Sequence, residues 1–243
     1  MKIQLPEHVK QIIHRLQQEG YDAYAVGGCV RDTLLGRSPQ DWDITTSAKP
    51  QVVKSLFSHT IDTGIAHGTV TVMLDHTGYE VTTYRIDGEY EDARHPKTVT
   101  FTGNLVEDLK RRDFTINAMA VCLNKARFGE LVDPFNGLDD LKERTIRTPL
   151  DPDITFSDDP LRMMRCVRFA TQLNFYIDDT TFEALSRNKE RIHIISKERI
   201  ADELNKILLA PIPSKGFIEL DRCGLLPLIF PEPVSYTHLR AHE

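Results

Sequence analysis

The glycines and aspartates between residues 27 and 43 form the pattern with the clearest chemical meaning. Gly27 and Gly28 open a predicted helix, where backbone N–H groups and the helix dipole favour a phosphate. Asp41 and Asp43 lie two positions apart in a predicted strand, so both carboxylates would project from one face and could share a divalent cation. Each pattern alone is common in turns and solvated loops. Together they predict a site for a metal-bound nucleoside triphosphate.

Hydrophobic periodicity predicts the elements that position these residues. In the first 150 residues the expected helices are 5–19, 28–35, 49–57, 105–111 and 137–143. The expected strands are 21–26, 42–45, 98–101 and 118–123, with a hairpin of 69–74 and 79–85 that turns over residues 76–78. The charged, aperiodic segment 87–97 is expected to be a mobile loop.

The later part of the chain is predicted to be helical, over 160–173, 180–188, 197–209 and 215–223. The sequence therefore predicts an α+β fold with a mixed-sheet head domain at 1–150 and a small helical neck domain at 151–233. Residues 234–243 do not continue the helical pattern, and we interpret them as a foreign or frameshifted tail.

Composition is typical of a soluble globular protein, with 40% hydrophobic and 27% charged residues among 243. No apolar run has membrane-spanning length, and no signal peptide is recognisable. Four cysteines far apart in sequence predict free thiols and a cytoplasmic location. The net charge of −6 is uneven: residues 1–160 carry −7 and residues 161–222 carry +2. RNA contact would therefore begin in the second half.

Five stretches in order resemble the motifs of the class II, bacterial-type tRNA nucleotidyltransferases (CCA-adding enzymes) and the related poly(A) polymerases. They are residues 27–46, RRDFTINA at 111–118, DPFNGLDDL at 133–141, DDPLR at 158–162 and SKERI at 196–200. Asp158 stands where the family usually has glutamate. Family members run well past 243 residues, so the chain is expected to be their head and neck portion.

The resemblance implies a role for each motif residue. Asp41 and Asp43 would be the catalytic carboxylates and would hold two Mg²⁺ ions. The implied nucleotide-binding residues are Gly27, Gly28 and Arg31 at the phosphates, Arg112, Asp113 and Asn117 at the ribose, and Asp159, Arg162, Arg165 and Arg168 further on. Arg199 would have a supporting role near the base or the phosphates, and Glu203 would have a packing role.

Asp159 and Arg162 could select a base without a nucleic-acid template. They are three positions apart in a predicted helix and would share a face. Cytosine and adenine each present an amino donor beside a ring-nitrogen acceptor, whereas uracil and guanine present the opposite pattern. A carboxylate beside a guanidinium therefore matches C and A.

Plainer interpretations of these residues stay open. Arg31 could pair with Asp32, Asp159 and Arg162 could form a structural ion pair, and the Arg111–Arg112 pair could complement a helix dipole. Glu80 is either a third metal carboxylate or an exposed strand residue. Arg165 and Arg168 could instead be structural partners of head carboxylates.

We expect an enzyme that adds C and A to the 3′ end of tRNA, from CTP and ATP with Mg²⁺, and that has no membrane partner. An A-adding enzyme or a poly(A) polymerase is the alternative within the superfamily. Residues 64–70 look more like the CCA enzymes, and the family associates the loop containing His95 with A addition. A glycosyltransferase using Asp-x-Asp and a catalytically silent RNA-binding fragment are the alternatives from other classes.

Overall fold

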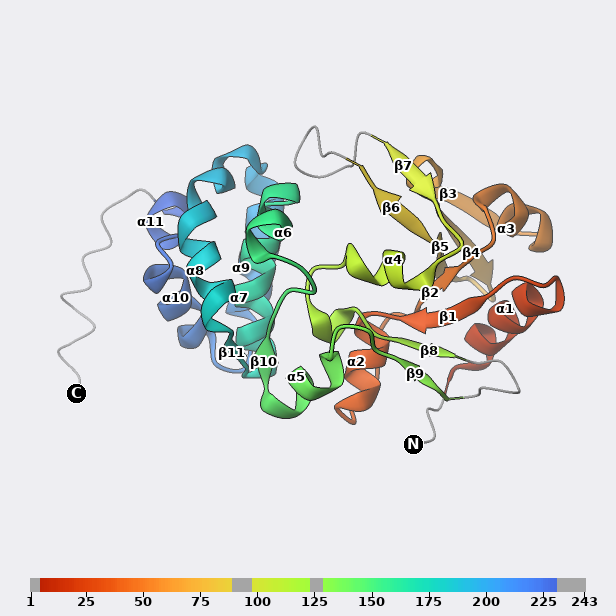
Figure 1. The fold of residues 1–243 in the computed structure, drawn as a ribbon, viewed down its shortest axis with the longest axis horizontal. Coiled ribbons are helices and arrows are strands. Elements are labelled where there is room, and N and C mark those ends of the chain that lie inside the picture. The colour runs from red at the N-terminus through yellow and green to blue at the C-terminus, as the bar shows by residue number, and fades with distance from the viewer. Residues whose placement is uncertain (1–4, 89–97, 123–128, 231–243) are drawn as a thin grey trace. The chain divides into compact units, whose positions relative to one another are not determined.

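The computed structural model describes residues 5–88, 98–122 and 129–230, which divide into two compact units (Figure 1). Unit 1 is Met1–Glu143 with Arg147–Leu150, and unit 2 is Arg144–Ile146 with Asp151–Glu243. Among the described residues, no helix is both long and apolar enough to cross a membrane.

Unit 1 is built on a seven-stranded sheet in the order β3-β4-β5-β2-β1-β8-β9. Its strands are β1 (Ala23–Val26), β2 (Asp43–Thr46), β3 (Thr60–Gly64), β4 (Thr69–Leu74), β5 (Thr77–Thr83), β8 (Ala120–Cys122) and β9 (Leu131–Val132). The β2–β5 pair is parallel and the other pairs are antiparallel. The predicted mixed-sheet α+β fold is thereby confirmed.

Helices and short ribbons complete unit 1. The helices are α1 (Glu7–Gln18), α2 (Gly28–Leu34), α3 (Pro50–Leu56), α4 (Leu105–Lys110) and α5 (Gly137–Glu143), with 3-10 turns η1 (Ile65–His67) and η2 (Thr115–Asn117). Strands β6 (Arg85–Asp87) and β7 (Val99–Phe101) pair as a separate two-stranded ribbon. In α1 the buried side chains are those at the predicted helical spacing: Val9, Ile12, Ile13 and Leu16.

A buried cluster holds α4 against one face of the sheet. Leu109 of α4 packs with Tyr24 and Val26 of β1 and with Ala120 and Cys122 of β8. This anchoring matters for the site because it holds Asp108, the residue before Leu109 in α4, beside Thr45 of β2.

Unit 2 is helical, as predicted. Its helices are α6 (Pro152–Asp158), α7 (Leu161–Leu173), α8 (Asp179–Asn188), α9 (Lys197–Leu208), α10 (Pro213–Arg222) and α11 (Leu226–Ile229), with the 3-10 segment η4 (Lys189–Ile194). Short strands β10 (Thr145–Ile146) and β11 (Tyr176–Ile177) pair in parallel. Helix α7 supplies much of the core, with ten of its 13 residues buried.

Several local elements differ from the predictions. The hairpin turns over Asp75 and His76, both at positive φ, because Asp and His tolerate the left-handed region that a two-residue turn requires. Strand β3 escaped prediction because it is an exposed edge strand without apolar alternation. Helix α6 was missed as well, although Asp151 caps it and Pro152 begins it.

Two predictions fall largely or wholly on residues outside the described part of the chain. Most of the predicted loop 87–97 lies there, although Asp87 itself belongs to β6. The segment 234–243 lies there entirely. All four cysteines are described; each is buried and is a free thiol.

Candidate functional site

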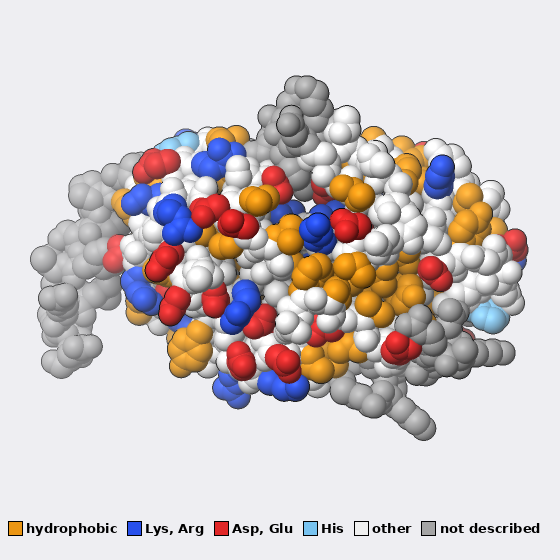
Figure 2. All heavy atoms as spheres, viewed as in Figure 1, with side chains coloured by type: hydrophobic (Ala, Val, Ile, Leu, Met, Phe, Trp, Pro, Cys, Tyr) orange, Lys and Arg blue, Asp and Glu red, His pale blue; other side chains and the backbone are white. Residues whose placement is uncertain are grey.

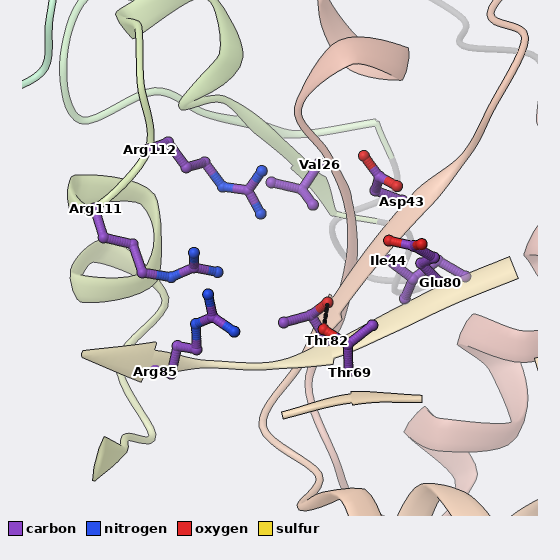
Figure 3. A pocket seen from close by; sticks show the side chains of 9 residues that line it. All are labelled: Val26, Asp43, Ile44, Thr69, Glu80, Thr82, Arg85, Arg111 and Arg112. Atoms are coloured by element: carbon purple, nitrogen blue, oxygen red, sulfur yellow. Dashed lines mark hydrogen bonds between the residues drawn. The ribbon is translucent and has the colours of Figure 1, made fainter. Parts of the chain in front are cut away.

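A pocket of about 190 Å³ in unit 1 brings opposite charges face to face (Figure 3). Its lining residues are Val26, Asp43, Ile44, Thr69, Glu80, Thr82, Arg85, Arg111 and Arg112. Figure 3 shows the three guanidinium groups on one side of the pocket and the carboxylates of Asp43 and Glu80 on the other. Such a pocket suits a ligand that carries both anionic groups and a bound cation.

The acidic side of the pocket is formed by neighbouring strands. Asp43 begins β2, and the parallel register that pairs Ile44 with Val81 sets Glu80 beside it. The pKa of Asp43 is raised by burial; the charge of Arg112 opposes the rise, and that of Asp41 adds to it. The pKa of Glu80 is raised by partial burial and then by the charges of Asp43 and Asp41. The three carboxylates therefore interact, although Glu80 is also exposed, as the plainer interpretation expected.

Asp41 lies outside the strand. It is an exposed residue that precedes β2, so the prediction that Asp41 and Asp43 project from one strand is wrong. Its charge nevertheless contributes to the raised pKa of both Asp43 and Glu80.

The carboxylates suit a divalent cation. Within the described ranges, no group of three His, Cys, Asp or Glu residues has the arrangement of a metal site. Mg²⁺, however, is usually held by one or two carboxylates together with substrate phosphates and water. The mutual repulsion of these carboxylates is what such an ion would relieve.

The basic side depends on a buried aspartate of α4. Asp108 is fully buried and accepts hydrogen bonds from Arg111 at 2.8 Å and from Thr45 of β2 at 3.1 Å. Nη2 of Arg112 lies 3.5 Å from Oδ2 of Asp108, the oxygen that also accepts from Thr45. Burial alone would raise the pKa of Asp108, but the charges of Arg111 and Arg112, together with hydrogen bonds from Arg111 and Thr45, lower it. Arg111 and Arg112 thus complement a buried carboxylate beside β2.

Gly27 lies between the two sides. It caps α2 with a φ of +82°, a conformation that glycine adopts without strain. A Cβ at this position would lie 3.1 Å from Nη1 of Arg112 and 3.8 Å from Oδ2 of Asp43. The structure therefore brings Gly27, Asp43 and Arg112 close together, with Gly28 as the first residue of α2.

A chain of buried polar contacts joins the first motif to the second. Arg31 pairs with Asp32, as one alternative expected, and its Nη1 donates to Oδ1 of Asn117 at 2.7 Å. Asn117 in turn donates to Oδ1 of Asp113 at 3.1 Å. The described contacts of Arg31 thus fix Asn117 and Asp113 in place, while its contact with phosphate stays a prediction.

The third motif supports the second, a role that sequence reasoning did not assign. Asp133 accepts the backbone N–H groups of Gly137 and Leu138, each at 2.8 Å, at the start of α5. Asp140 accepts a 2.6 Å hydrogen bond from the hydroxyl of Thr115 in η2. A Cβ on Gly137 would lie only 2.3 Å from the Thr115 carbonyl oxygen. Close packing of α5 on η2 therefore requires this glycine.

In unit 2, Asp159 lies between helices. Its φ of −136° and ψ of 98° are extended, because the following Pro160 disfavours the helical region. The prediction that Asp159 and Arg162 share one helix is therefore wrong. Asp159 instead precedes α7, and its side chain accepts the N–H of Leu161 at 3.1 Å. Arg199 of α9 lies 3.4 Å from its other carboxylate oxygen.

Arg168 of α7 is buried in a network within unit 2. Its Nε pairs with Glu203 of α9 at 2.5 Å, and its Nη1 donates to Gln172 at 3.0 Å. The guanidinium lies 4.0 Å from the ring centre of Phe169, and that of Arg165 lies 5.5 Å from the same ring. These contacts favour a structural role for Arg168, with Glu203 of α9 as one partner.

Comparison with known proteins places these features in a family. Residues 23–147 match the family described as "Poly A polymerase head domain", which is about half of the chain. The chain belongs to this poly(A) polymerase head-domain family. Residues 174–236 also match "Probable RNA and SrmB- binding site of polymerase A".

Relatives of this poly(A) polymerase head-domain protein include CCA-adding enzymes. The one from Limosilactobacillus reuteri is 46% identical over 229 residues, which are 93% of this chain and 56% of the relative. The chain also resembles the crystal structure of the Bacillus stearothermophilus CCA-adding enzyme in complex with CTP. That match has a TM-score of 0.82 and 44% identity, and covers 89% of this chain and 51% of the other.

The Thermotoga maritima CCA-adding enzyme complexed with tRNA_CCA is also similar, at a TM-score of 0.77 and 29% identity. It is covered to 52%, and this chain to 93%. The resemblance to CCA-adding enzymes is confirmed. The chain of this family member spans about half the length of the relatives it matches.

The structure adds pocket residues that the predicted site did not include. Arg85 and Arg111 line the pocket, as do Thr69 and Thr82. One signal was available in the sequence, since Glu80 and Thr82 are two apart in a predicted strand and share its face. The arginines carried no such signal, because they reach the pocket from β6 and from the end of α4.

Proposed function

We propose that this chain is the catalytic portion of a template-independent tRNA nucleotidyltransferase that adds C and A to the 3′ end of tRNA from CTP and ATP. The observation that carries the proposal is the arrangement of Asp43 and its neighbouring carboxylates opposite Arg112, with Gly27 between them. The likeness to CCA-adding enzymes solved with CTP and with tRNA supports the same substrates.

Asp41 and Asp43 would hold Mg²⁺, with Glu80 as a neighbouring carboxylate. The bound ions would neutralise the triphosphate and lower the pKa of the RNA 3′-hydroxyl. Arg112 and the backbone N–H of Gly28 would bind phosphate oxygens, because the Arg112 guanidinium lies next to Gly27 and Asp43, and Gly28 begins α2. The N–H of Gly27 donates to the carbonyl oxygen of Met119.

The second motif would recognise the ribose. Asp113 and Asn117 are buried and are held by Arg31, so their polar groups are oriented before a substrate arrives. A 2′-hydroxyl that donates to Asp113 would favour ribonucleotides, since a deoxynucleotide would leave that acceptor without its partner.

Asp159 and Arg162 would select the base. Arg199 and the N–H of Leu161 hold the Asp159 carboxylate, which favours one orientation. The Asp acceptor and the Arg donors match the amino group and ring nitrogen shared by cytosine and adenine. Arg165 would be a further nucleotide contact, and Arg168 would shape α7 through Glu203.

The 3′ end of tRNA is the proposed acceptor, and unit 2 the first RNA-contacting part. Figure 2 shows Lys and Arg side chains of this unit interspersed with Asp and Glu on the face in view. A balanced surface makes few net phosphate contacts, so we expect RNA binding by this chain to be weak and strongly salt-dependent. Poly(A) synthesis is the second candidate, favoured by the name of the matching family.

Binding measurements with the four ribonucleoside triphosphates would test the proposal. With Mg²⁺ present, CTP and ATP should bind more tightly than UTP and GTP. Binding of a nucleoside diphosphate sugar in their place would favour a glycosyltransferase, and no binding would favour a silent RNA-binding fragment. Incubation with tRNA lacking CCA, tRNA lacking only A, or unrelated RNA, followed by 3′-end sequencing, would separate CCA addition from poly(A) synthesis.

A further inference from the structure

Arg85 and Arg111 line the candidate nucleotide pocket but have no role in the function described above. Figure 3 shows both guanidinium groups pointing into the pocket beside Arg112, across from Asp43 and Glu80. Arg85 comes from β6, whereas Arg111 caps the C-terminus of α4. A strand of the separate ribbon and a helix therefore contribute the same kind of side chain to one wall.

Two buried carboxylates hold these arginines in position. Asp87 lies 2.8 Å from Nε of Arg85 and 3.7 Å from Nη1 of Arg111, with 4% of its side chain exposed. Asp108 lies 2.8 Å from Arg111 and 3.5 Å from Arg112, with none of its side chain exposed. The carbonyl oxygen of His67 accepts a further hydrogen bond from Arg85. Long side chains fixed in this way lose little entropy when a ligand binds.

The wall presents three guanidinium groups to the pocket. Among the described residues, Asp87 and Asp108 form ion pairs with them. The hydroxyls of Thr69 and Thr82, 3.0 Å apart, line the pocket between this wall and the carboxylates. The guanidinium fork matches the geometry of phosphate oxygens, and a hydroxyl group can donate to them as well.

We propose that Arg85 and Arg111 bind the β- and γ-phosphates of the substrate and retain them as pyrophosphate when the nucleotide is transferred. This inference rests on the proposed function. In the transfer, the RNA 3′-oxygen forms a bond to the α-phosphorus and its proton passes to solvent. The bond from the α-phosphorus to the oxygen bridging to the β-phosphate breaks, and that oxygen leaves with the electron pair. The arginine wall stabilises the charge that develops on the leaving group.

The wall is fixed to the strand that carries the catalytic carboxylate. Thr45 is two residues after Asp43 in β2 and donates to Asp108, which holds Arg111 and Arg112. Arg111 and Asp43 are therefore joined through one strand and one buried aspartate. This connection fixes the position of the leaving-group contacts relative to the metal-binding carboxylates.

Calorimetric titration of the 243-residue chain with Mg²⁺-pyrophosphate, Mg²⁺-ATP and AMP would test the wall. The variants are Arg85→Gln and Arg111→Gln, with Arg85→Lys and Arg111→Lys as conservative partners. Arg15→Gln serves as a matched control, because Arg15 forms an exposed ion pair with Glu19 on α1. Thermal unfolding of each variant is recorded alongside.

We expect the Gln variants to bind pyrophosphate and ATP on the order of tenfold more weakly, with the Lys variants in between. AMP, which lacks both distal phosphates, should bind each variant as it binds wild type. A merely structural role would weaken AMP and ATP together, or would change the melting temperature alone.

Two results would contradict these proposals, and each contradicts a different one. If the wild-type chain binds neither ATP nor CTP, the proposed function is wrong. If it binds them, and folded Arg85 and Arg111 variants bind pyrophosphate as wild type does, the arginine wall is wrong. Because Arg111 also neutralises Asp108, an unfolded Arg111→Gln variant would leave the decision to Arg85→Gln and the two Lys variants.

Discussion

Two groups of arginines in this molecule illustrate different uses of the same side chain. In unit 1, Arg85, Arg111 and Arg112 rest on buried aspartates and turn their guanidinium groups into a pocket. In unit 2, Arg168 has its guanidinium over the Phe169 ring and pairs with Glu203 between α7 and α9. A motif match assigned Arg112 and Arg168 to one nucleotide site, whereas their surroundings favour ligand binding for the first and packing for the second.

The largest effect should come from the acidic side of the pocket in unit 1. We expect Asp43→Ala to lower nucleotide transfer to a tRNA minihelix on the order of 10³-fold, because transition-state charge stabilisation is lost. Stability should be unchanged or higher, since burial and Asp41 make the ionised Asp43 unfavourable. Single-turnover kinetics and thermal melting would check both. Asp62→Ala, at an exposed ion pair with Lys54, is the control. Turnover above a tenth of wild type would contradict the assignment.

The second prediction tests the packing role in unit 2. Glu203→Ala removes the carboxylate that neutralises buried Arg168, which should lower the free energy of unfolding by about 3–5 kcal/mol. Urea denaturation would measure the change, with Glu183→Ala as an exposed control. Pyrophosphate affinity of the folded variant should stay at the wild-type value. An unchanged urea midpoint would show that the Arg168–Glu203 pair contributes no net stability.

The third prediction concerns base selection. Asp159→Ala should relax discrimination against UTP and GTP by about 1–3 kcal/mol, the cost of a buried hydrogen-bonding group without its partner. Incorporation assays with all four triphosphates would measure it. Arg199→Gln removes the ion pair that holds the Asp159 carboxylate but keeps the carboxylate itself. It should also relax discrimination against UTP and GTP, but by a smaller amount. Wild-type preference for C and A in Asp159→Ala would show that the base is chosen elsewhere.

The smallest effect is a dependence of stability on pH in each unit. Despite burial, Arg111 and Arg112 hold the pKa of Asp108 below its usual value, and Arg168 does the same for Glu203. A lowered folded pKa stabilises the protein above the unfolded pKa, about 4, and this stabilisation is lost as the pH falls through the folded pKa. We expect the unfolding free energies of Asp108→Asn and Glu203→Gln to fall less steeply than that of wild type below about pH 4. Equal slopes would contradict both assignments.

The sequence by itself determined what depends on neighbours along the chain. The periodicity of α1, the Gly27–Gly28 pair at the start of α2 and the alternation in β4 are local signals, so these elements were predicted close to their observed bounds. The extended backbone at Asp159 also has a local cause, because Pro160 follows it. The prediction overlooked this signal, because the spacing of Asp159 and Arg162 suggested a shared helix.

Only the tertiary structure decided which charges share the pocket. Glu80 reaches Asp43 because two strands far apart in sequence pair in parallel, and Arg85 meets Arg111 because both contact Asp87. The same holds for Arg168, whose partner Glu203 lies 35 positions away. Periodicity reports which face of an element is buried, but it carries no information on which distant side chain will neutralise a buried charge.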